Sequence, residues 1–280
     1  MQLLDTHQHL LYRDEFNYAW SDELPAIAKK NFTVEDYQDV TKDYNVAASI
    51  FMEVDADDYQ KETRFIAELA VDQANRIIGL ISSCRPEIDA GFDAWLEECG
   101  ELPIVGFRRI LHEVSDAMSK NENFRKNVRK IGKCGQVFDM VFRADQLGIA
   151  KEFAQSCDDM HLVLDHCGVP DIAGGKMDDW RNAISALAEL PHVSCKISGI
   201  LTYCKSGEAN LESIRPYVDH VIEVFGSQRL VWGSDWPVVN LNSGLPQWVD
   251  IFCELVNGLS TDEADAVGSG NAQRIYNVSM

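Results

Sequence analysis

Short apolar runs typical of β-strands recur eight times along the 280 residues of the chain. Most of these runs are continuous rather than alternating, which is typical of parallel strands buried on both faces. Helix-like stretches separate them, so that strand and helix alternate along the whole chain. This rhythm predicts an α/β fold, and in particular a closed (β/α)₈ TIM barrel. The runs cover residues 1–7, 46–54, 76–84, 103–111, 136–142, 161–168, 192–199 and 229–236.

The rest of the chain favours the barrel over its competitor, an open doubly wound sheet. Such a sheet often carries G-x-G-x-x-G after its first strand, and no such motif follows residues 1–7. No linker divides the chain, so we expect one domain over residues 1–280, close to the ~250 residues of a typical barrel. Residues 10–45 are interpreted as a long excursion after the first strand. The clearest helical patterns cover residues 62–75, 148–159, 179–190 and 213–226, the last interrupted near its start by Pro216.

The chain is strongly acidic, with 45 Asp and Glu against 25 Lys and Arg and a formal net charge of −20. Nucleic acids and anionic membranes would be repelled, so neither is an expected partner. No run of about 18 apolar residues is present, and the start of the chain lacks the pattern of a secretory signal. The eight cysteines form no C-x-x-C pair, which argues against a thiolate zinc ribbon. A cytoplasmic protein with reduced thiols is therefore expected.

Polar side chains gather where the predicted strands end. His7 and His9 end the first strand and are spaced by two, so both imidazoles point to the same face. The carboxyl ends of barrel strands meet at one rim, where functional groups collect. His161 and His192 begin strands and His220 lies on a helix, so we interpret these three as structural. The other strand ends carry Glu53, Arg108 with Arg109 and His112, Asp165 with His166, Lys196 with Ser198, and Asp235 with Trp236.

These segments, taken in order, resemble a known family. DTHQHL (5–10), VLDHCGVP (163–170), CKISG (195–199) and WGSDWP (232–237) are similar to motifs of the amidohydrolase superfamily. FNYAW, GFRRILH and GNAQRIYNV narrow the resemblance to the amidohydrolase family 2 branch. This branch contains sugar-acid lactonases, such as L-fuconolactone and L-rhamnonolactone hydrolases and 2-pyrone-4,6-dicarboxylate lactonase. The resemblance spans nearly the whole chain and implies a barrel enzyme that hydrolyses a bond at a carbonyl group.

The resemblance also bears on metal binding. Two-metal members of the superfamily use a carboxylated lysine at strand four and a histidine at strand five. Here strand four ends in arginines and residues 136–145 contain no histidine, so a two-metal centre is not expected. One divalent ion, with Zn²⁺ favoured, would instead be held by His7, His9, His166 and Asp235. The lactonase branch includes members that work without metal, so the requirement stays open. No organic cofactor is expected.

The expected reaction is the opening of a lactone ring by water. Asp235 is the predicted general base, and once protonated it would return the proton to the leaving oxygen. The oxyanion would be stabilised by a metal on His7 and His9, or by these imidazoles with His166 and Arg108 as donors. The predicted substrate-binding residues are Glu53, Lys196, Trp20, Trp236 and His112. The structural alternatives are that Arg108 bridges strands inside the barrel, that Lys196 pairs with Asp165 or Glu53, that Glu53 orients a histidine, and that the tryptophans only pack.

A neutral, polyhydroxylated sugar lactone is the predicted small-molecule substrate. Only Arg108, Arg109 and Arg143 are expected near the rim, which is few for a dicarboxylate on so acidic a protein. Two other functions stay open. One is a metal-dependent decarboxylase or hydratase of an unsaturated or aromatic carboxylic acid, and the other is a barrel that binds a ligand without turnover. The sequence does not decide the oligomeric state, and a homo-oligomer is one option.

Overall fold

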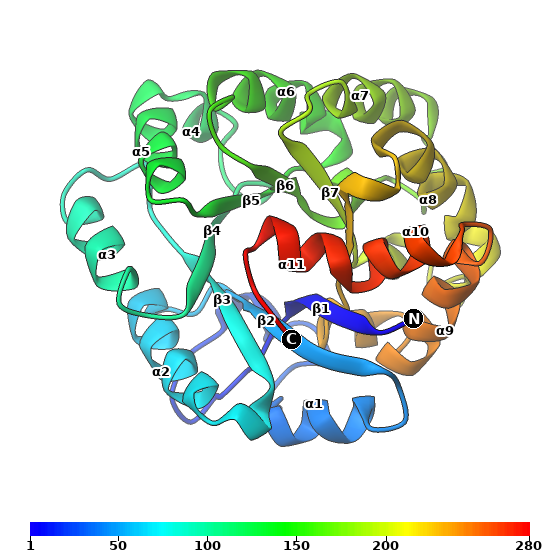
Figure 1. Ribbon diagram of the computed structural model, residues 1–280, viewed down its shortest axis with the longest axis horizontal. Helices are drawn as coiled ribbons and strands as arrows, with labels where there is room; N and C mark the ends of the chain where they lie inside the picture. The colour runs from blue at the N-terminus through cyan, green and yellow to red at the C-terminus, as the bar shows by residue number, and fades with distance from the viewer.

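The computed structural model describes residues 1–280 and contains one sheet of eight parallel strands. Strands that follow one another in the chain are neighbours in the sheet, and the helices lie around them (Figure 1). The ring closes between β1 and the end of β8, where the backbone N–H of Asp235 donates to the carbonyl of His7 at 2.9 Å. The (β/α)₈ barrel is thus confirmed. The strands are β1 (Leu3–Gln8), β2 (Val46–Met52), β3 (Ile77–Ser83), β4 (Ile104–Ile110), β5 (Val137–Val141), β6 (Leu162–Leu164), β7 (Val193–Ile197) and β8 (Leu230–Trp232).

The predicted helices are present, with shifted ends. Helix α2 begins earlier than expected because the side chain of Asp58 accepts from the backbone N–H of Lys61 and caps it. Helix α8 runs through Pro216 without a break, contrary to the expected interruption, and its start is capped by Asn210. No helix has the length and apolar character needed to cross a membrane. The helices are α1 (Val34–Thr41), α2 (Tyr59–Val71), α3 (Phe92–Cys99), α4 (Ala117–Lys120), α5 (Glu122–Lys133), α6 (Leu147–Ser156), α7 (Asp178–Ala188), α8 (Leu211–Phe225), α9 (Leu245–Val256), α10 (Thr261–Asp265) and α11 (Asn271–Ile275).

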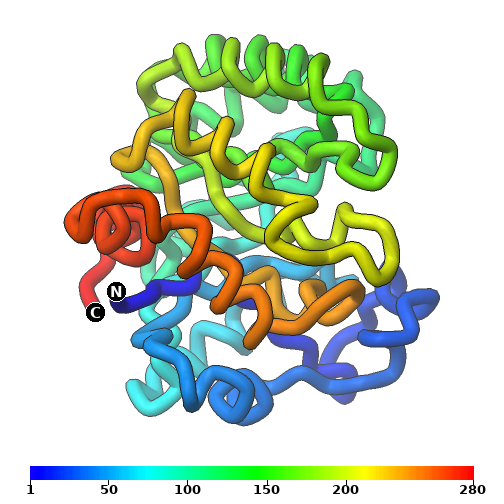
Figure 2. The backbone as a smooth tube through the Cα atoms, turned by 90° about the vertical axis from the view of Figure 1, so that its right-hand side faces the viewer, coloured from blue at the N-terminus to red at the C-terminus, as the bar shows by residue number.

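The two ends of the barrel differ in chemistry. At the amino-terminal end of the strands, apolar side chains such as Leu4, Ile50 and Val231 fill the interior. Helix α11 lies across this end, and Ile275 and Tyr276 pack into the same cluster (Figure 1). Both chain termini lie at this end of the barrel (Figure 1 and Figure 2). The polar strand ends lie at the opposite rim.

Residues 10–45 form the predicted excursion after β1 and include α1. Leu11 and Phe32 pair in an antiparallel bridge, which closes the first part of the excursion into a loop. Phe16 and Tyr18 pack with Val54 after β2 in a small apolar cluster apart from the main core. Phe16 and Tyr18 therefore pack against the rim near β2.

Glu62 of α2 is a buried carboxyl group whose two oxygens have no hydrogen-bond partner. Burial, reinforced by the nearby charge of Glu53, raises the pKa of Glu62 well above its usual range. Because the pKa of this group is higher in the folded than in the unfolded chain, its contribution to the stability of the fold is fully present at pH values below the unfolded pKa. That stability is lost as pH rises through the folded pKa, because the buried group must then ionise.

We therefore expect Glu62→Gln to raise the free energy of unfolding at pH 8 by about 1–3 kcal/mol, and to change it little near pH 4. Denaturant unfolding at the two pH values measures this difference. Glu68→Gln, on the exposed face of the same helix, is the matched control and should have little effect at either pH. A Glu62→Gln variant that is no more stable than the wild type at pH 8 would contradict the expectation.

Candidate active site

The ends of β1 and β8 bring two histidines and an aspartate together. The rings of His7 and His9 meet edge to face, with centroids 4.8 Å apart. Asp235 follows β8, and its Oδ1 lies 3.4 Å from Nε2 of His9 and 3.7 Å from Nε2 of His7. All three side chains are almost fully buried. Residues from opposite ends of the chain thus meet at one rim of the barrel.

His166 joins this group from the end of β6. Its ring centroid lies 4.5 Å from that of His7, and its Nδ1 lies 2.8 Å from the hydroxyl of Ser198 after β7. Ligand atoms of His7, His166 and Asp235 all lie within 4.8 Å of one another. Burial lowers the pKa of His166 and lowers the pKa of His7 strongly. Both imidazoles are therefore neutral at pH 7.

The backbone turns sharply where these side chains leave the strands. His166 and Asp235 have left-handed φ angles of 55° and 56°, which residues other than glycine rarely adopt. This conformation costs about 1–2 kcal/mol per residue, so the surrounding contacts must maintain it. Gly199 gives both side chains room, because a Cβ there would lie 2.5 Å from Nδ1 of His166 and 2.8 Å from Oδ2 of Asp235. Backbone strain at two clustered polar residues is typical of a functional site.

Asp5 joins the ends of β1 and β8 next to the site. Its Oδ1 accepts hydrogen bonds from the backbone N–H of Ser234 at 2.7 Å and of His7 at 3.0 Å. Its Oδ2 accepts from the hydroxyl of Tyr37 on α1 at 2.6 Å. The Asp5 carboxyl group therefore sets the spacing between His7 and the residue that precedes Asp235.

Arg108, from the end of β4, lies behind His7. Its Nε donates to Oε1 of Glu53 at 2.7 Å, and its Nη2 donates to the backbone carbonyl of Glu53 at 2.6 Å. Its Nη1 lies 3.1 Å from Nε2 of His7 and 3.2 Å from Oδ2 of Asp165. Burial alone would raise the pKa of Glu53, but the guanidinium of Arg108 outweighs it and lowers that pKa. Arg108 and Glu53 are both almost fully buried, and their hydrogen bonds join β2, β4 and β6.

Lys196 of β7 lies inside the barrel with no exposed surface. Its Nζ contacts Oδ2 of Asp139 at 2.5 Å, Oδ1 of Asp165 at 3.1 Å and the carbonyl of Thr6 at 3.0 Å. Burial opposes ionisation of Asp165, but the charge of Lys196 holds the pKa of Asp165 well below its usual range. All polar contacts of Lys196 are made to other protein groups, as in the structural alternative considered for it.

The hydrogen bonds assign the proton positions on the two histidines of β1. Nδ1 of His9 lies 2.9 Å from the carbonyl oxygen of Met52, which can only accept, so Nδ1 carries the hydrogen and Nε2 holds a lone pair. On His7, the guanidinium of Arg108 can only donate, so Nε2 accepts and Nδ1–H points to Asp165. The lone pair of His9 faces the carboxylate of Asp235 at 3.4 Å. Two facing acceptors are stabilised by a positive charge between them, either a proton or a cation.

Comparison with known proteins agrees with this geometry. Residues 4–278 match the family described as amidohydrolase. The chain belongs to the amidohydrolase family. It is 29% identical to an L-fucono-1,5-lactonase of Burkholderia multivorans, over 98% of this chain and 95% of the relative. It is 34% identical to an L-fucono-1,5-lactonase of Burkholderia ambifaria, over 50% of each chain. A crystal structure of an amidohydrolase from Burkholderia multivorans with bound zinc has a TM-score of 0.91 and 27% identity, covering 100% of both chains.

The donor set of this amidohydrolase fits a single divalent ion. Imidazole nitrogens and a carboxylate are common zinc ligands, and a set of three leaves a coordination position open. The backbone carbonyl that holds Nδ1 of His9 directs its lone pair into the site, as in many metal-binding histidines. His9 lies outside the compact group of His7, His166 and Asp235, but its Nε2 faces Asp235. To bind the metal through Nε2, His7 would have to give up the hydrogen bond that this nitrogen accepts from Arg108.

The remaining predicted site residues are not part of this compact group. Nε1 of Trp20 donates to the carbonyl of Val54 at 2.8 Å, in the apolar cluster near β2. Trp236 is almost fully buried and packs edge-on against Phe32 and Tyr37. Both indoles thus have packing or hydrogen-bond partners within the protein, and a contact of either one with substrate stays a prediction. His112 keeps 27% of its side chain exposed, and burial together with nearby positive charges lowers its pKa to about 4.

Tyr203 was not predicted from the sequence, although it lies next to the candidate site of the amidohydrolase. Its ring centroid is 6.4 Å from that of His166. On the surface, Tyr203 also lines a cleft of about 570 Å³ that is bounded by Arg143, Pro170 and Lys176. A tyrosine in the loop after a barrel strand has no distinguishing sequence signal, which is why the pattern did not single it out.

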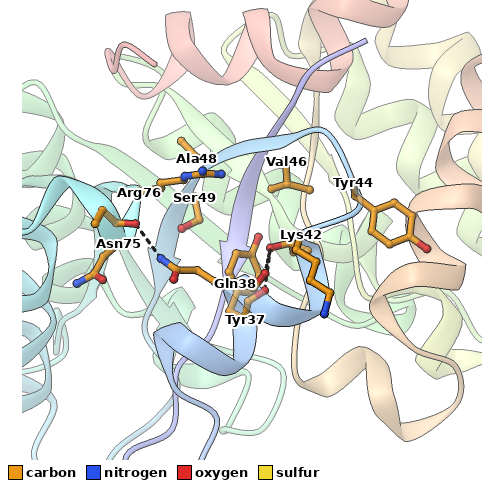
Figure 3. A pocket seen from close by; sticks show the side chains of 11 residues that line it. Tyr37, Gln38, Lys42, Tyr44, Val46, Ala48, Ser49, Asn75 and Arg76 are labelled. Atoms are coloured by element: carbon orange, nitrogen blue, oxygen red, sulfur yellow. Dashed lines mark hydrogen bonds between the residues drawn. The ribbon is translucent and has the colours of Figure 1, made fainter.

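A second hollow lies away from the histidines. This cavity of about 250 Å³ lies between α1 and the start of β2, where it is lined by Gln38, Lys42 and Arg76 among others (Figure 3). Two of its lining residues reach toward the site: the hydroxyl of Tyr37 donates to Asp5, and the hydroxyl of Ser49 donates to Gln8 at 2.9 Å. The cavity contains none of the predicted catalytic residues, so the candidate site stays at the carboxyl rim.

Proposed function

We propose that the protein hydrolyses the ring ester of a sugar-derived lactone. The observation that carries this proposal is the carboxylate of Asp235 beside the imidazoles of His7, His9 and His166 at the carboxyl rim of the barrel. A carboxylate next to neutral imidazoles provides both a base for water and polar groups for a carbonyl oxygen. The relatives named L-fucono-1,5-lactonase support a lactone as the substrate.

Asp235 acts as the general base. A water molecule next to its Oδ1 gives up a proton to the carboxylate while the water oxygen forms a bond to the lactone carbonyl carbon. When the ring C–O bond breaks, the protonated Asp235 returns this proton to the leaving oxygen. The product is a hydroxy acid, which releases its own carboxyl proton to solvent. Asp235 therefore ends the cycle ionised, and no other strong acid is required.

Without a metal, the imidazole donor for the negative charge on the carbonyl oxygen would be Nε2–H of His166, because the N–H groups of His7 and His9 face Asp165 and the carbonyl of Met52. A preorganised donor of this kind typically contributes about 3 kcal/mol to the stability of the transition state. Arg108 is buried, and its N–H groups contact Glu53, His7 and Asp165. We therefore propose that Arg108 positions His7 and does not contact the substrate. We likewise assign Glu53 a role in holding Arg108.

A single divalent ion, with zinc as the first candidate, would be held by His7, His166 and Asp235, which leaves a position open, and His9 beside Asp235 is the fourth predicted ligand. When bound, such an ion supplies a Lewis acid that polarises the carbonyl and stabilises the developing negative charge. The zinc in the related crystal structure from Burkholderia multivorans supports this assignment. The neutral imidazoles of His7 and His166 suit it too, because only the unprotonated ring can ligate a metal.

A neutral polyhydroxylated lactone suits the rim better than a dicarboxylate does. Arg109 contacts Glu87 at 3.0 Å, and Arg143 contacts Asp145 at 3.1 Å. Each cation that the sequence placed at the rim therefore already has an acidic partner. A substrate carboxylate would have to displace these partners, whereas sugar hydroxyls can hydrogen-bond to both members of each pair.

Acid release from a panel of sugar lactones tests the proposal. We expect L-fucono-1,5-lactone or a close stereoisomer to be opened with a kcat/KM of about 10⁴ M⁻¹ s⁻¹ or more, after subtraction of the uncatalysed rate. A pH indicator separates this reaction from decarboxylation, because opening a lactone releases protons and decarboxylation consumes them. Chelation followed by addition of zinc shows whether the rate needs the metal. Proton uptake with aromatic acids, and none released from lactones, would contradict the proposal.

A further inference from the structure

Tyr276, directly after α11, places a polar group inside the closed end of the barrel. Its ring packs among apolar side chains at the amino-terminal end of the strands, and only 2% of the residue is exposed. Its hydroxyl lies 2.9 Å and 3.1 Å from the two carboxylate oxygens of Asp139 on β5. The carboxylate can only accept while it is ionised, so the Tyr276 hydroxyl donates. An apolar side chain would fill this space at lower desolvation cost, so the buried hydroxyl calls for an explanation.

Polar contacts continue from Tyr276 to the candidate site. Asp139 contacts Nζ of Lys196 at 2.5 Å, and Lys196 contacts Oδ1 of Asp165 at 3.1 Å. The same Oδ1 lies 3.5 Å from Nδ1 of His7. We call this set, Tyr276, Asp139, Lys196, Asp165 and His7, the buried polar chain. It connects the carboxyl-terminal segment at one end of the barrel with the histidines at the other.

Lys196 is the central member of the buried polar chain. It has no exposed surface and lies between the carboxylates of Asp139 and Asp165. The hydroxyl of Tyr276 is the only hydrogen-bond partner of Oδ1 of Asp139. Oδ2 of Asp139 has two partners, Nζ of Lys196 and the same hydroxyl of Tyr276. Without that hydroxyl, one carboxylate oxygen would be buried and unpaired, and Lys196 would be drawn further toward Asp139. Because Asp165 shares the same ammonium group, its position beside His7 depends on this balance.

We propose that Tyr276 is a positioning residue for the candidate active site and that it acts on His7 through Asp139, Lys196 and Asp165. The inference rests on the lactonase proposed above, because its kinetic readout is lactone opening. It predicts that Tyr276 affects the rate of the reaction, although this residue lies at the opposite end of the barrel from the substrate. Tyr276 itself touches neither substrate nor water in the reaction.

Tyr276→Phe tests the proposal, because it keeps the ring and removes the hydroxyl. We expect kcat for lactone opening to fall about 3- to 30-fold, the usual size of coupling through a packed network, with KM within about twofold, since no substrate contact is lost. Tyr217→Phe is the matched control. Tyr217 is also buried, but its hydroxyl has no hydrogen-bond partner and it packs against Trp180 outside the barrel. Equal rates for wild type and Tyr276→Phe, or an equal loss in Tyr217→Phe, would overturn the proposal.

A double-mutant cycle tests the route. If Tyr276 acts through Asp139, adding Tyr276→Phe to Asp139→Asn should lower kcat little further, because the carboxylate that links Tyr276 to Lys196 is already lost. Fully additive losses of the two substitutions would overturn the route through Asp139.

Imidazole ¹⁵N–¹H correlation spectra give a readout that does not depend on turnover. The His7 signals are identified by their absence in His7→Asn, and we expect Tyr276→Phe to shift them. The signals of His192, whose Nε2 contacts the carbonyl of Ala154, should stay in place. If no lactone is opened by the wild type, the proposed function fails while these spectra still test the buried polar chain. Unchanged His7 signals in Tyr276→Phe would overturn the inference even if the rate fell.

Discussion

Replacing Asp235 with asparagine is expected to lower kcat/KM for the lactone about 10²- to 10⁴-fold, the usual contribution of a general base. Asparagine has nearly the same size and is one of the residues that tolerates the left-handed φ of 56° found at this position. The fold should therefore persist, and the loss should reflect the missing base. Initial rates of acid release, together with circular dichroism and thermal unfolding of the variant, measure both effects.

Asp55→Asn provides a matched control for this experiment. Asp55 is also an aspartate with a left-handed φ, at 54°, and it follows β2 on the same rim. Its side chain is 44% exposed and contacts Arg85 at 3.8 Å, away from the histidines. We expect nearly wild-type rates for this variant. A wild-type rate in Asp235→Asn would show that another group activates the water.

Gly199→Ala is expected to remove most activity and to destabilise the fold by about 2–4 kcal/mol. A Cβ at this position would meet Nδ1 of His166 at 2.5 Å and Oδ2 of Asp235 at 2.8 Å, and the φ of +61° is strained for any side chain. The methyl group must therefore push apart two groups that the proposed reaction needs together. We expect kcat to fall more than about 100-fold, as small displacements in an active site can cause. Kinetics and denaturant unfolding measure the two effects separately.

Gly207→Ala separates backbone strain from the steric effect. Gly207 lies in the same connection between β7 and α8 and has a φ of +77°, but a Cβ there would meet nothing within 4 Å. This variant should lose about 1–2 kcal/mol of stability from the left-handed backbone alone, and it should keep its activity. If both alanine variants had the same activity, the close approach of Gly199 to the site would have no role in the reaction.

The barrel and the location of its candidate site could be predicted from the sequence. Parallel strands buried on both faces give continuous apolar runs, which mark each strand without an alignment. Once the runs are placed, the carboxyl ends of all strands must share one rim, so His7 and His9 had to lie near His166 and Asp235. Helix ends were less predictable, because a cap such as Asp58 lies outside the apolar pattern that marks the helix.

The contacts inside the barrel could not be predicted in the same way. A polar residue at a strand end can point to substrate or to a neighbouring strand, and the sequence alone does not distinguish the two. Lys196 and Glu53 were assigned to substrate, whereas the structure places them in ion pairs within the barrel. Asp139 is an acid within the apolar run of β5 that was not singled out from the sequence, and its partner Tyr276 is 137 positions away. Only the closed ring brings these residues together.

The central claim is that Asp235 activates a water molecule that attacks the lactone carbonyl. Hydrolysis of a sugar lactone in ¹⁸O-labelled water, with protein in excess over lactone, tests this claim most directly. The account predicts one ¹⁸O atom in the carboxylate of the hydroxy acid after the first turnover, and none in the peptide that contains Asp235. Label in Asp235, as a covalent acyl intermediate would leave there, or lactone opening no faster than in buffer, would contradict the account.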